Sequence, residues 1–218
     1  MSNIAQELTR MQLAKEDIKD SLVDNGIAVG NEHLTNYCLY VDDVKPKVDI
    51  NEIVDSISDT DPLTMIQTDP EGGFVTVVMS TANLTAKSMQ WKKNNGNWTS
   101  FISGDKVFLN YGDTLQWRST NTTSFSYSGD YRSYAGSGSY ILKGDVMSMM
   151  NNSTSALPTY CFRCMFMYFP VVETYVKINP SGGLSTWCCR EMYAGCIQLR
   201  KAKFVISKMN ERGYIWMF

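Results

Sequence analysis

The chain has 218 residues, of which 44% are apolar and 19% are charged, and its formal net charge is −2. This length allows one large domain or two to three small modules, and no apolar run is long enough to cross a bilayer. Residues 1–72 carry 15 acidic and 5 basic side chains, whereas residues 73–218 carry 7 and 15. This division fits a solvated acidic head on an ordinary basic domain, or a head that docks and a body that presents a surface.

The first predicted element is a helix over residues 3–24. Its apolar residues are spaced 4, 3, 7 and 4 positions apart, which is a heptad-like stripe across about three heptads. The stripe fits either an amphipathic helix packed on its own core or a short self-association seam. The candidate assembly residues are Ile4, Leu8, Met11, Ile18 and Leu22.

Two more helical segments are expected at residues 34–44 and 49–61, followed by a linker over 62–73. The N-terminus lacks a basic region followed by an apolar stretch, so we expect no secretion signal. The chain would then stay in the cytoplasm in which it is made, or leave it as part of an assembled particle.

From residue 74 onward, β-branched runs alternate with turns rich in Gly, Asn and Asp, which predicts an antiparallel β sandwich over residues 73–143. The expected strands are 74–79, 88–92, 98–102, 106–109, 114–118, 124–127 and 140–143. The polar stretch 119–139 is expected to be a long exposed excursion. Its tyrosines, Tyr127, Tyr131 and Tyr134, are candidates for stacking on sugar rings.

The C-terminal region, residues 144–218, repeats itself with a period of 27 residues. The expected repeat core is Tyr160, Cys161, Met165 and Phe166, matched by Trp187, Cys188, Met192 and Tyr193. Each unit is predicted to hold a short helix followed by an extended stretch, at 171–178 and 201–206. A unit of this size cannot bury its own apolar face and must stack on a neighbour, an arrangement typical of binding and scaffold surfaces.

Candidate sites for chemistry are few. The six cysteines fit either a zinc site or small buried thiols on the inner face of the repeat, and we expect the second, since the only histidine is His33. No nucleotide-binding, metalloprotease or hydrolase motif is present, so we expect no enzyme and no cofactor. A basic cluster that includes Arg200, Lys201 and Lys203 is a candidate surface for phosphate or a polyanionic glycan.

Several stretches carry a resemblance to known proteins. They are Trp91–Ser100, Ser103–Val107, Gly144–Met150, Leu157–Phe162 with Met165 and Phe166, and Cys188 with Met192–Cys196. Together they resemble surface and virion proteins with leucine-rich repeats of the BspA type, found in Bacteroidetes and their phages, including crAss-like phages. In that family a small β domain precedes many repeats, whereas this chain stops after two and a fraction. Separately, Leu13–Gly26 resembles the helix-then-glycine segment near the N-termini of phage tail and fibre proteins.

These observations predict an α+β multi-module chain. Residues 1–72 form a helical acidic attachment module, 73–143 a central antiparallel β sandwich, and 144–218 a short leucine-rich-repeat-like stack. The resemblance implies a structural virion protein, a fibre component or adaptor that contacts other virion proteins and a host surface glycan or protein. By analogy with fibres we expect a homo-oligomer, with a trimer favoured, and neither nucleic-acid binding nor membrane insertion. The alternative is a bacterial surface adhesin or glycan-binding module.

Overall fold

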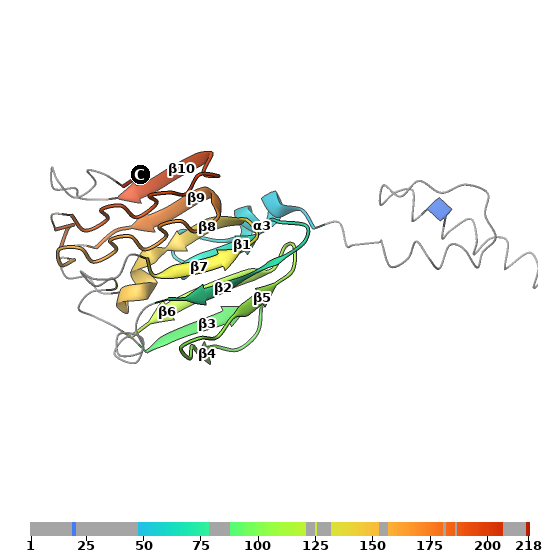
Figure 1. The fold of residues 1–218 in the computed structure, drawn as a ribbon, viewed down its shortest axis with the longest axis horizontal. Helices are drawn as coiled ribbons and strands as arrows, with labels where there is room; N and C mark the ends of the chain where they lie inside the picture. Colours follow the sequence, from blue (N-terminus) through green and yellow to red (C-terminus); the bar gives the residue numbers. More distant parts are fainter. Residues whose placement is uncertain are drawn as a thin grey trace, which may run out of the picture. The chain divides into compact units, whose positions relative to one another are not determined.

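The computed structural model describes residues 19–20, 48–78, 88–120, 125, 132–152, 157–180, 182–185, 187–206 and 217–218. The chain divides into two units, residues 1–48 and residues 49–218. In its described part, the second unit holds ten strands in two sheets, one α-helix and one 3-10 helix (Figure 1). No helix among the described residues has the length and apolar character that a membrane span requires.

The larger sheet has seven strands, and it changes from antiparallel to parallel along its width. Its order is β10 (Lys201–Ile206), β9 (Val171–Ile178), β8 (Tyr140–Asp145), β1 (Thr64–Gln67), β6 (Thr114–Ser119), β3 (Met89–Lys93) and β4 (Thr99–Ser100). Strands β8, β9 and β10 run parallel, and the remaining pairs are antiparallel. The smaller sheet is antiparallel, in the order β5 (Val107–Leu109), β2 (Gly73–Val77) and β7 (Tyr134–Ser137).

One continuous apolar core joins the two sheets and the repeat region. The ring of Trp117 on β6 meets the ring of Tyr134 on β7 edge-on, with centroids 5.3 Å apart. Tyr134 in turn stacks on Phe166 of the repeat, with centroids 5.5 Å apart and the planes inclined by only 14°. Because these contacts belong to a single core, the sandwich and the repeat fold as one body.

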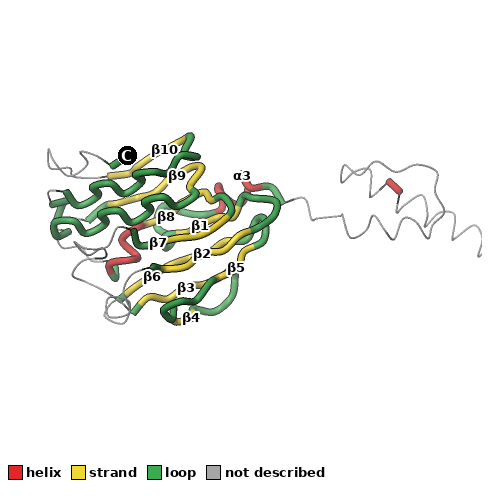
Figure 2. The backbone as a smooth tube through the Cα atoms, viewed as in Figure 1, coloured by secondary structure: helices red, strands yellow, loops and turns green. Residues whose placement is uncertain are grey.

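The repeat is built from two rungs, residues 157–178 and 184–206. Each rung starts with a tandem-turn segment (157–169 and 187–196) and ends in a strand, β9 or β10; the wavy loop traces beside these strands in Figure 2 include both segments. In both segments every fourth residue is left-handed. The φ angles are 62°, 54° and 59° at Tyr160, Cys164 and Tyr168, and 62°, 56° and 71° at Trp187, Glu191 and Gly195.

The hydrogen bonds of the rungs alternate along the chain. From Cys161 to Phe169 in the first rung, odd-numbered amides donate to the carbonyl three residues back, while even-numbered amides donate to the second rung. The bonds between rungs run from Phe162, Cys164, Phe166 and Tyr168 to the carbonyls of Cys188, Arg190, Met192 and Ala194, with N···O distances of 2.8 to 3.0 Å. A helix would satisfy its interior amides internally and leave few for the neighbouring rung. The expected short helices in the repeat are therefore wrong, and stacked turns take their place.

Helix α3 (Ile50–Ser56) covers part of the outer face of the seven-stranded sheet, the face opposite the core. Asp49 caps it, since its carboxylate accepts hydrogen bonds from the amides of Asn51 and Glu52. The apolar side of the helix packs on β1 and β8 in a second, small cluster. Its members are Ile50, Ile53, Val54, Ile57, Ile66, Ile141, Val172 and Tyr175.

The expected α+β fold of separate modules is wrong for the described part of the chain, which is mostly β with one short α-helix. The expected boundaries after residues 72 and 143 fall inside the unit that begins at Asp49. Strand β1 comes from the expected linker, yet it lies between β8 and β6 in the larger sheet. The two predicted extended stretches, 171–178 and 201–206, coincide with β9 and β10. Apart from residues 19 and 20, the helices expected at 3–24 and 34–44 lie outside the described residues.

Candidate ligand-binding groove

The parallel strands present rows of polar side chains on the outer face of the sheet. Successive residues of a strand point to opposite faces, so residues in register on β8, β9 and β10 form rows across the sheet. The central row is Lys143, Tyr175 and Lys203, which places an aromatic ring between two ammonium groups. The flanking rows are Ile141–Glu173–Lys201 and Asp145–Lys177–Val205.

A groove of about 640 Å³ lies between α3 and this face. It is lined by Asn51, Val54, Asp55, Asp59, Lys143, Tyr175, Lys201, Lys203 and Val205. The helix and the turn after it supply two carboxylates, and the strands supply three ammonium groups and one aromatic ring. The volume falls within the range of about 300–1,000 Å³ typical of small-ligand sites.

Two contacts hold the walls of the groove in place. Lys143 donates a hydrogen bond from its ammonium group to the carbonyl of Val54, which ties the helix to β8. The hydroxyl of Tyr175 donates to Glu173 on the same strand, and the ammonium nitrogen of Lys201 lies 5.0 Å from the Tyr175 ring centroid. The neighbouring hydroxyl of Tyr175 is the main cause that raises the pKa of Lys201.

Beside the groove, Asp145 joins strands β8 and β9 to the 3-10 helix η1 (Val146–Met150). One carboxylate oxygen accepts from the amide of Met147 at 2.9 Å, and the other lies 3.7 Å from the ammonium of Lys177. Burial is the largest influence on this carboxyl and raises its pKa, although the bond from Met147 and the charge of Lys177 oppose the shift. We interpret Asp145 as a structural joint because its carboxylate faces these two partners.

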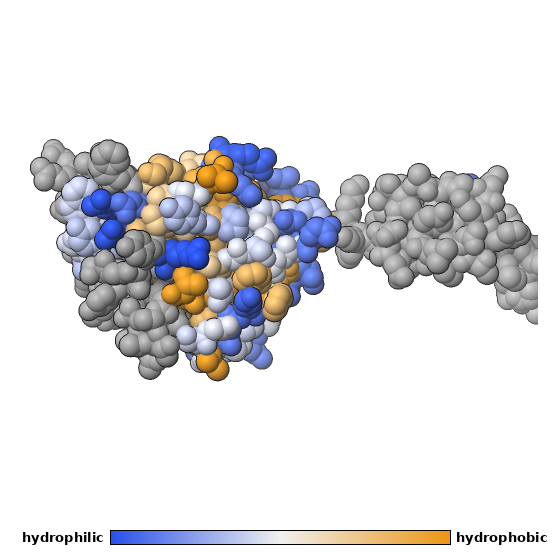
Figure 3. All heavy atoms as spheres, in the orientation of Figure 1, coloured by the Kyte–Doolittle hydropathy of each residue, from blue (hydrophilic) through white to orange (hydrophobic). Residues whose placement is uncertain are grey.

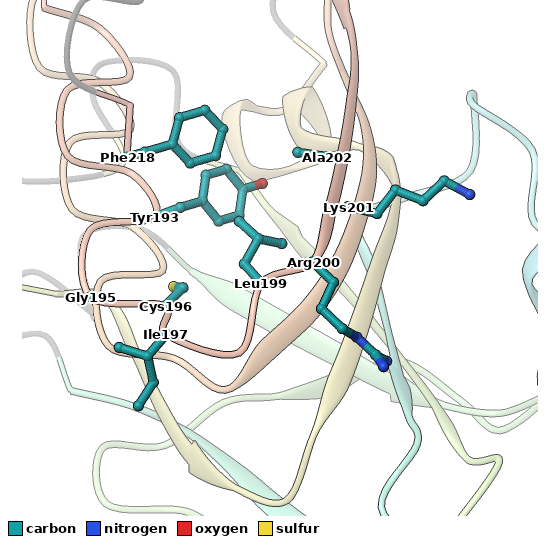
Figure 4. A pocket seen from close by; sticks show the side chains of 9 residues that line it. All are labelled: Tyr193, Gly195, Cys196, Ile197, Leu199, Arg200, Lys201, Ala202 and Phe218. Carbon is teal, nitrogen blue, oxygen red and sulfur yellow. The ribbon is translucent and has the colours of Figure 1, made fainter.

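A second hollow, of about 410 Å³, lies at the end of the rung stack. Figure 4 shows the rings of Tyr193 and Phe218 side by side next to Leu199, while the side chains of Arg200 and Lys201 extend away from them. The ring centroids of Tyr193 and Phe218 are 6.1 Å apart, and the amide of Tyr193 donates to the carbonyl of Met217. This hollow therefore lies where a further rung would stack on the repeat. Few of the side chains that point into it are polar groups that could orient a ligand.

The repeat residues have equivalent environments in the two rungs. Met165 and Met192, Cys161 and Cys188, and Phe166 and Tyr193 are all buried in the core. Tyr160 and Trp187 are half-buried instead, and each carries an arginine over its ring. The guanidinium of Arg163 lies 5.5 Å from the Tyr160 ring centroid, and that of Arg190 lies 5.1 Å from the Trp187 ring centroid.

A single carboxylate relieves the repulsion between the two stacked arginines. Glu191 lies 3.4 Å from Arg163 and 3.0 Å from Arg190. Burial would raise the pKa of Glu191, but a hydrogen bond with Cys164 and the two arginines lower it overall. Glu191 occupies the position that Cys164 holds in the first rung, so this difference between the repeats supplies the charge that the stack needs.

The other predicted site residues fall into three groups: exposed residues, one buried residue and residues outside the described part of the chain. Arg200, Lys201 and Lys203 are exposed, and the two lysines line the groove. Tyr134 is a correction: it is fully buried between Trp117 and Phe166 and cannot serve as a ligand surface, and burial raises its pKa well above the ordinary value. The remaining candidates lie outside the described residues: Ile4, Leu8, Met11, Ile18, Leu22, Tyr127 and Tyr131.

Sequence reasoning missed the groove residues Tyr175, Asp55, Asp59 and Lys143. A signal for Tyr175 exists, because residues 173–178 alternate between polar outward and buried inward positions. No such signal marks the two carboxylates, which belong to α3 and to the turn after it, and which tertiary packing places over the sheet. On the face shown in Figure 3, hydrophobic and hydrophilic residues are interspersed.

The cysteines of the described region are free thiols, four of them buried and Cys196 partly buried. Cys161, Cys188 and Cys189 belong to the core, and the described residues hold no group of three or more His, Cys, Asp or Glu arranged to bind a metal ion. Burial raises the pKa of Cys164 and of Cys196 to about 11. For Cys188, a hydrogen bond with the thiol of Cys161 lowers the pKa, but a hydrogen bond with the thiol of Cys189 and burial outweigh it and raise the pKa.

We therefore expect the folded chain to resist thiol alkylation at pH 8. A thiol with a pKa of about 11 is ionised in about one molecule in a thousand at that pH, and only the thiolate reacts. In a Cys38→Ser background, iodoacetamide should label Cys161, Cys164, Cys188, Cys189 and Cys196 at least about tenfold more slowly in buffer than in 8 M urea. Peptide mass spectrometry of the labelled chain measures this ratio, and rapid labelling of Cys188 in the folded state would contradict the packing described above.

In comparisons with protein families, curated proteins and solved structures, this chain matches no family model, no curated protein and no solved structure.

Proposed function

We propose that the chain is a structural virion protein, a fibre component or adaptor, in which residues 49–218 present a binding surface. The observation that carries the proposal is the two-rung stack, which continues the larger sheet in parallel and shares one core with the sandwich. Stacked rungs give an extended and rigid surface, which suits contact with another protein or with a host surface. The resemblance of the same region to proteins of the BspA type fits a surface protein as well as a virion protein. The resemblance of Leu13–Gly26 to phage tail and fibre proteins favours the virion.

The titratable groups also support a structural role. The groups with the most strongly raised pKa values are Tyr134, Tyr140, Tyr193 and Cys188. At active sites such shifts belong to groups that face a cleft. Here all four side chains belong to the core, and Tyr193, which also borders the hollow at the end of the rung stack, is only 2% exposed, so their shifts accompany packing. We therefore favour a scaffold role for residues 49–218.

Attachment to the particle is assigned to residues 1–48, and this part of the proposal rests on the sequence alone. The heptad-like stripe of five apolar residues predicts self-association, with a trimer favoured by analogy with fibres. A variant with Ile4, Leu8, Ile18 and Leu22 changed to serine should have a smaller mass by multi-angle light scattering than the unchanged chain. An unchanged mass would remove the seam from the proposal.

Mass spectrometry of purified phage particles tests the main claim. The particles must come from a phage that encodes this chain, and they should contain its peptides after density-gradient purification. A capsid protein of the same phage is the positive control, and a non-structural replication protein is the negative control. Peptides found only in the infected-cell lysate would overturn the proposal.

A bacterial surface adhesin or glycan-binding module is the second candidate. The groove between α3 and β10 favours it, because this concavity combines an aromatic ring with hydrogen-bonding groups of both signs. The two candidates differ in location, whereas a glycan ligand is compatible with both.

A further inference from the structure

We propose that the groove between α3 and the strands β8, β9 and β10 binds an acidic oligosaccharide, with its carboxylate at Lys201 and Lys203 and a sugar ring over Tyr175. This inference deepens the proposed function, since it names the chemical class of the host surface ligand. It rests on the groove's composition, on the row of side chains at its floor and on the balance of its charges.

The floor offers an aromatic face that is held in position. Tyr175 is half-buried against the cluster under α3, its hydroxyl donates to Glu173, and the ammonium of Lys201 lies 5.0 Å from its ring centroid. Its ring is thereby fixed at the centre of the row Lys143–Tyr175–Lys203. A fixed aromatic ring binds the C–H face of a sugar at little cost in side-chain entropy.

The walls offer both kinds of hydrogen-bonding partner that sugar hydroxyls need. Asp55 and Asp59 on the helix side are acceptors, and Asn51 supplies an amide that both donates and accepts. All three are exposed at the rim. Hydroxyl groups donate and accept at once, so a chain of sugars can use acceptors on one wall and donors on the other.

The charges favour a ligand with a carboxylate. Lys143 already donates a hydrogen bond to the carbonyl of Val54, whereas Lys201 and Lys203 are exposed on the edge strand. These two lysines follow one another on the same face of β10, so they can share one carboxylate. Glu173, which lies in register with Lys201, and the two aspartates opposite disfavour a uniformly anionic polymer, which would place negative charge beside them. Alternating neutral and acidic sugars fit this pattern better than a polyanion does.

Isothermal titration calorimetry on the full chain tests the inference with 3′-sialyllactose and lactose, which differ by one acidic sugar. Cellobiouronic acid, a glucuronic acid linked to glucose, and cellobiose form a second acidic and neutral pair, which differ by one carboxylate. At 150 mM salt, where charges separated by more than about 8 Å are screened, at least one acidic member should bind, about tenfold or more tightly than its neutral partner. Equal binding within both pairs, or no binding of either acidic sugar, overturns the inference.

Three variants locate the site. Lys201→Gln with Lys203→Gln should weaken the acidic sugar about tenfold or more, while Lys106→Gln, an exposed lysine on the edge of the smaller sheet, should leave it unchanged. Tyr175→Phe keeps the ring and should retain binding within about threefold, whereas Tyr175→Leu should lose it. Near-ultraviolet circular dichroism confirms that each variant is folded. Equal weakening by Lys106→Gln, or retained binding in Tyr175→Leu, would contradict the assigned site.

A poly-glutamate peptide separates the sugar from simple anion attraction. If this peptide binds as tightly as the acidic sugars, the groove is a general anion or acidic-protein surface and the inference fails. The sugar-binding inference and the proposed function can also fail independently of each other. A chain present in particles that binds no sugar loses the inference alone, and a chain that binds the acidic sugar but is absent from particles loses the virion assignment alone.

Discussion

Replacing Phe166 by alanine is expected to lower the free energy of unfolding by about 3–5 kcal/mol. Phe166 is fully buried at the centre of a ladder of rings, with its centroid 5.5 Å from that of Tyr134 and 5.4 Å from that of Tyr193. The ladder joins the sandwich to both rungs, so the cavity would lie where no single element can close over it. Urea denaturation followed by tryptophan fluorescence measures the loss.

The matched control is Phe108→Ala. Phe108 is 68% exposed on β5 and contacts Phe74 with a centroid distance of 6.0 Å, so its loss should change the free energy by no more than about 0.5 kcal/mol. If Phe166→Ala costs as little as this control, the ladder does not bear on stability. A biphasic transition in the wild-type chain's 49–218 unit would also contradict the single core.

Replacing Gly144 by alanine is expected to cost about 3 kcal/mol or more. Gly144 has φ +91°, and a Cβ there would lie 2.6 Å from the carbonyl oxygen of Pro62 and 2.7 Å from that of Asp61. These backbone atoms are themselves held, because the amide of Asp145 donates to Asp61 and the amide of Leu63 donates to Asp145. The chain that enters β1 crosses Gly144 at this point, so an alanine must push the crossing away.

Gly104→Ala separates the cost of the clash with the crossing chain from the cost of a positive φ angle. Gly104 has nearly the same φ, +92°, but a Cβ there meets nothing within 4 Å. Its replacement should cost only the strain of a positive φ, about 1–2 kcal/mol. The difference between the two variants, measured by the same urea titration, should be at least about 1 kcal/mol. Equal losses would show that the approach of the Asp61–Pro62 backbone has no energetic weight.

These two glycines look alike in the sequence, since each precedes an aspartate, but Gly104 lies in a turn whereas Gly144 lies in β8. In the turns at Gly104 and Gly112 the following aspartate closes the turn: the carboxylate of Asp105 accepts from the amide of Ile102 at 3.1 Å, and that of Asp113 accepts from the amide of Asn110 at 2.8 Å. Such turns are visible from the sequence because their hydrogen bonds span three residues. The crossing over Gly144 is not visible, because it brings together residues about eighty positions apart.

The candidate site was predictable only in part for the same reason. Lys201 and Lys203 stand out as a basic pair in sequence, and the structure places both on the groove. Tyr134 was misassigned because its neighbours in sequence are polar, whereas its neighbours in space are Trp117 and Phe166. Asp55 and Asp59 look like part of an acidic head, and only the packing of α3 on β1 and β8 brings them to the basic strands.

The sequence by itself determined the 27-residue period, the two strands that end the rungs and the aromatic–Cys–x–Arg pattern. The strands follow from short-range order, and the period and the pattern follow because identical or similar residues stack on one another in the two rungs. Only the tertiary structure decided that the rungs are turns and not helices, because half of the first rung's amides find their acceptors in the next rung. It likewise decided that sandwich and repeat share one sheet. A strand's place in a sheet is set by the partner with which its backbone pairs, and for β1, between β8 and β6, those partners lie far along the chain.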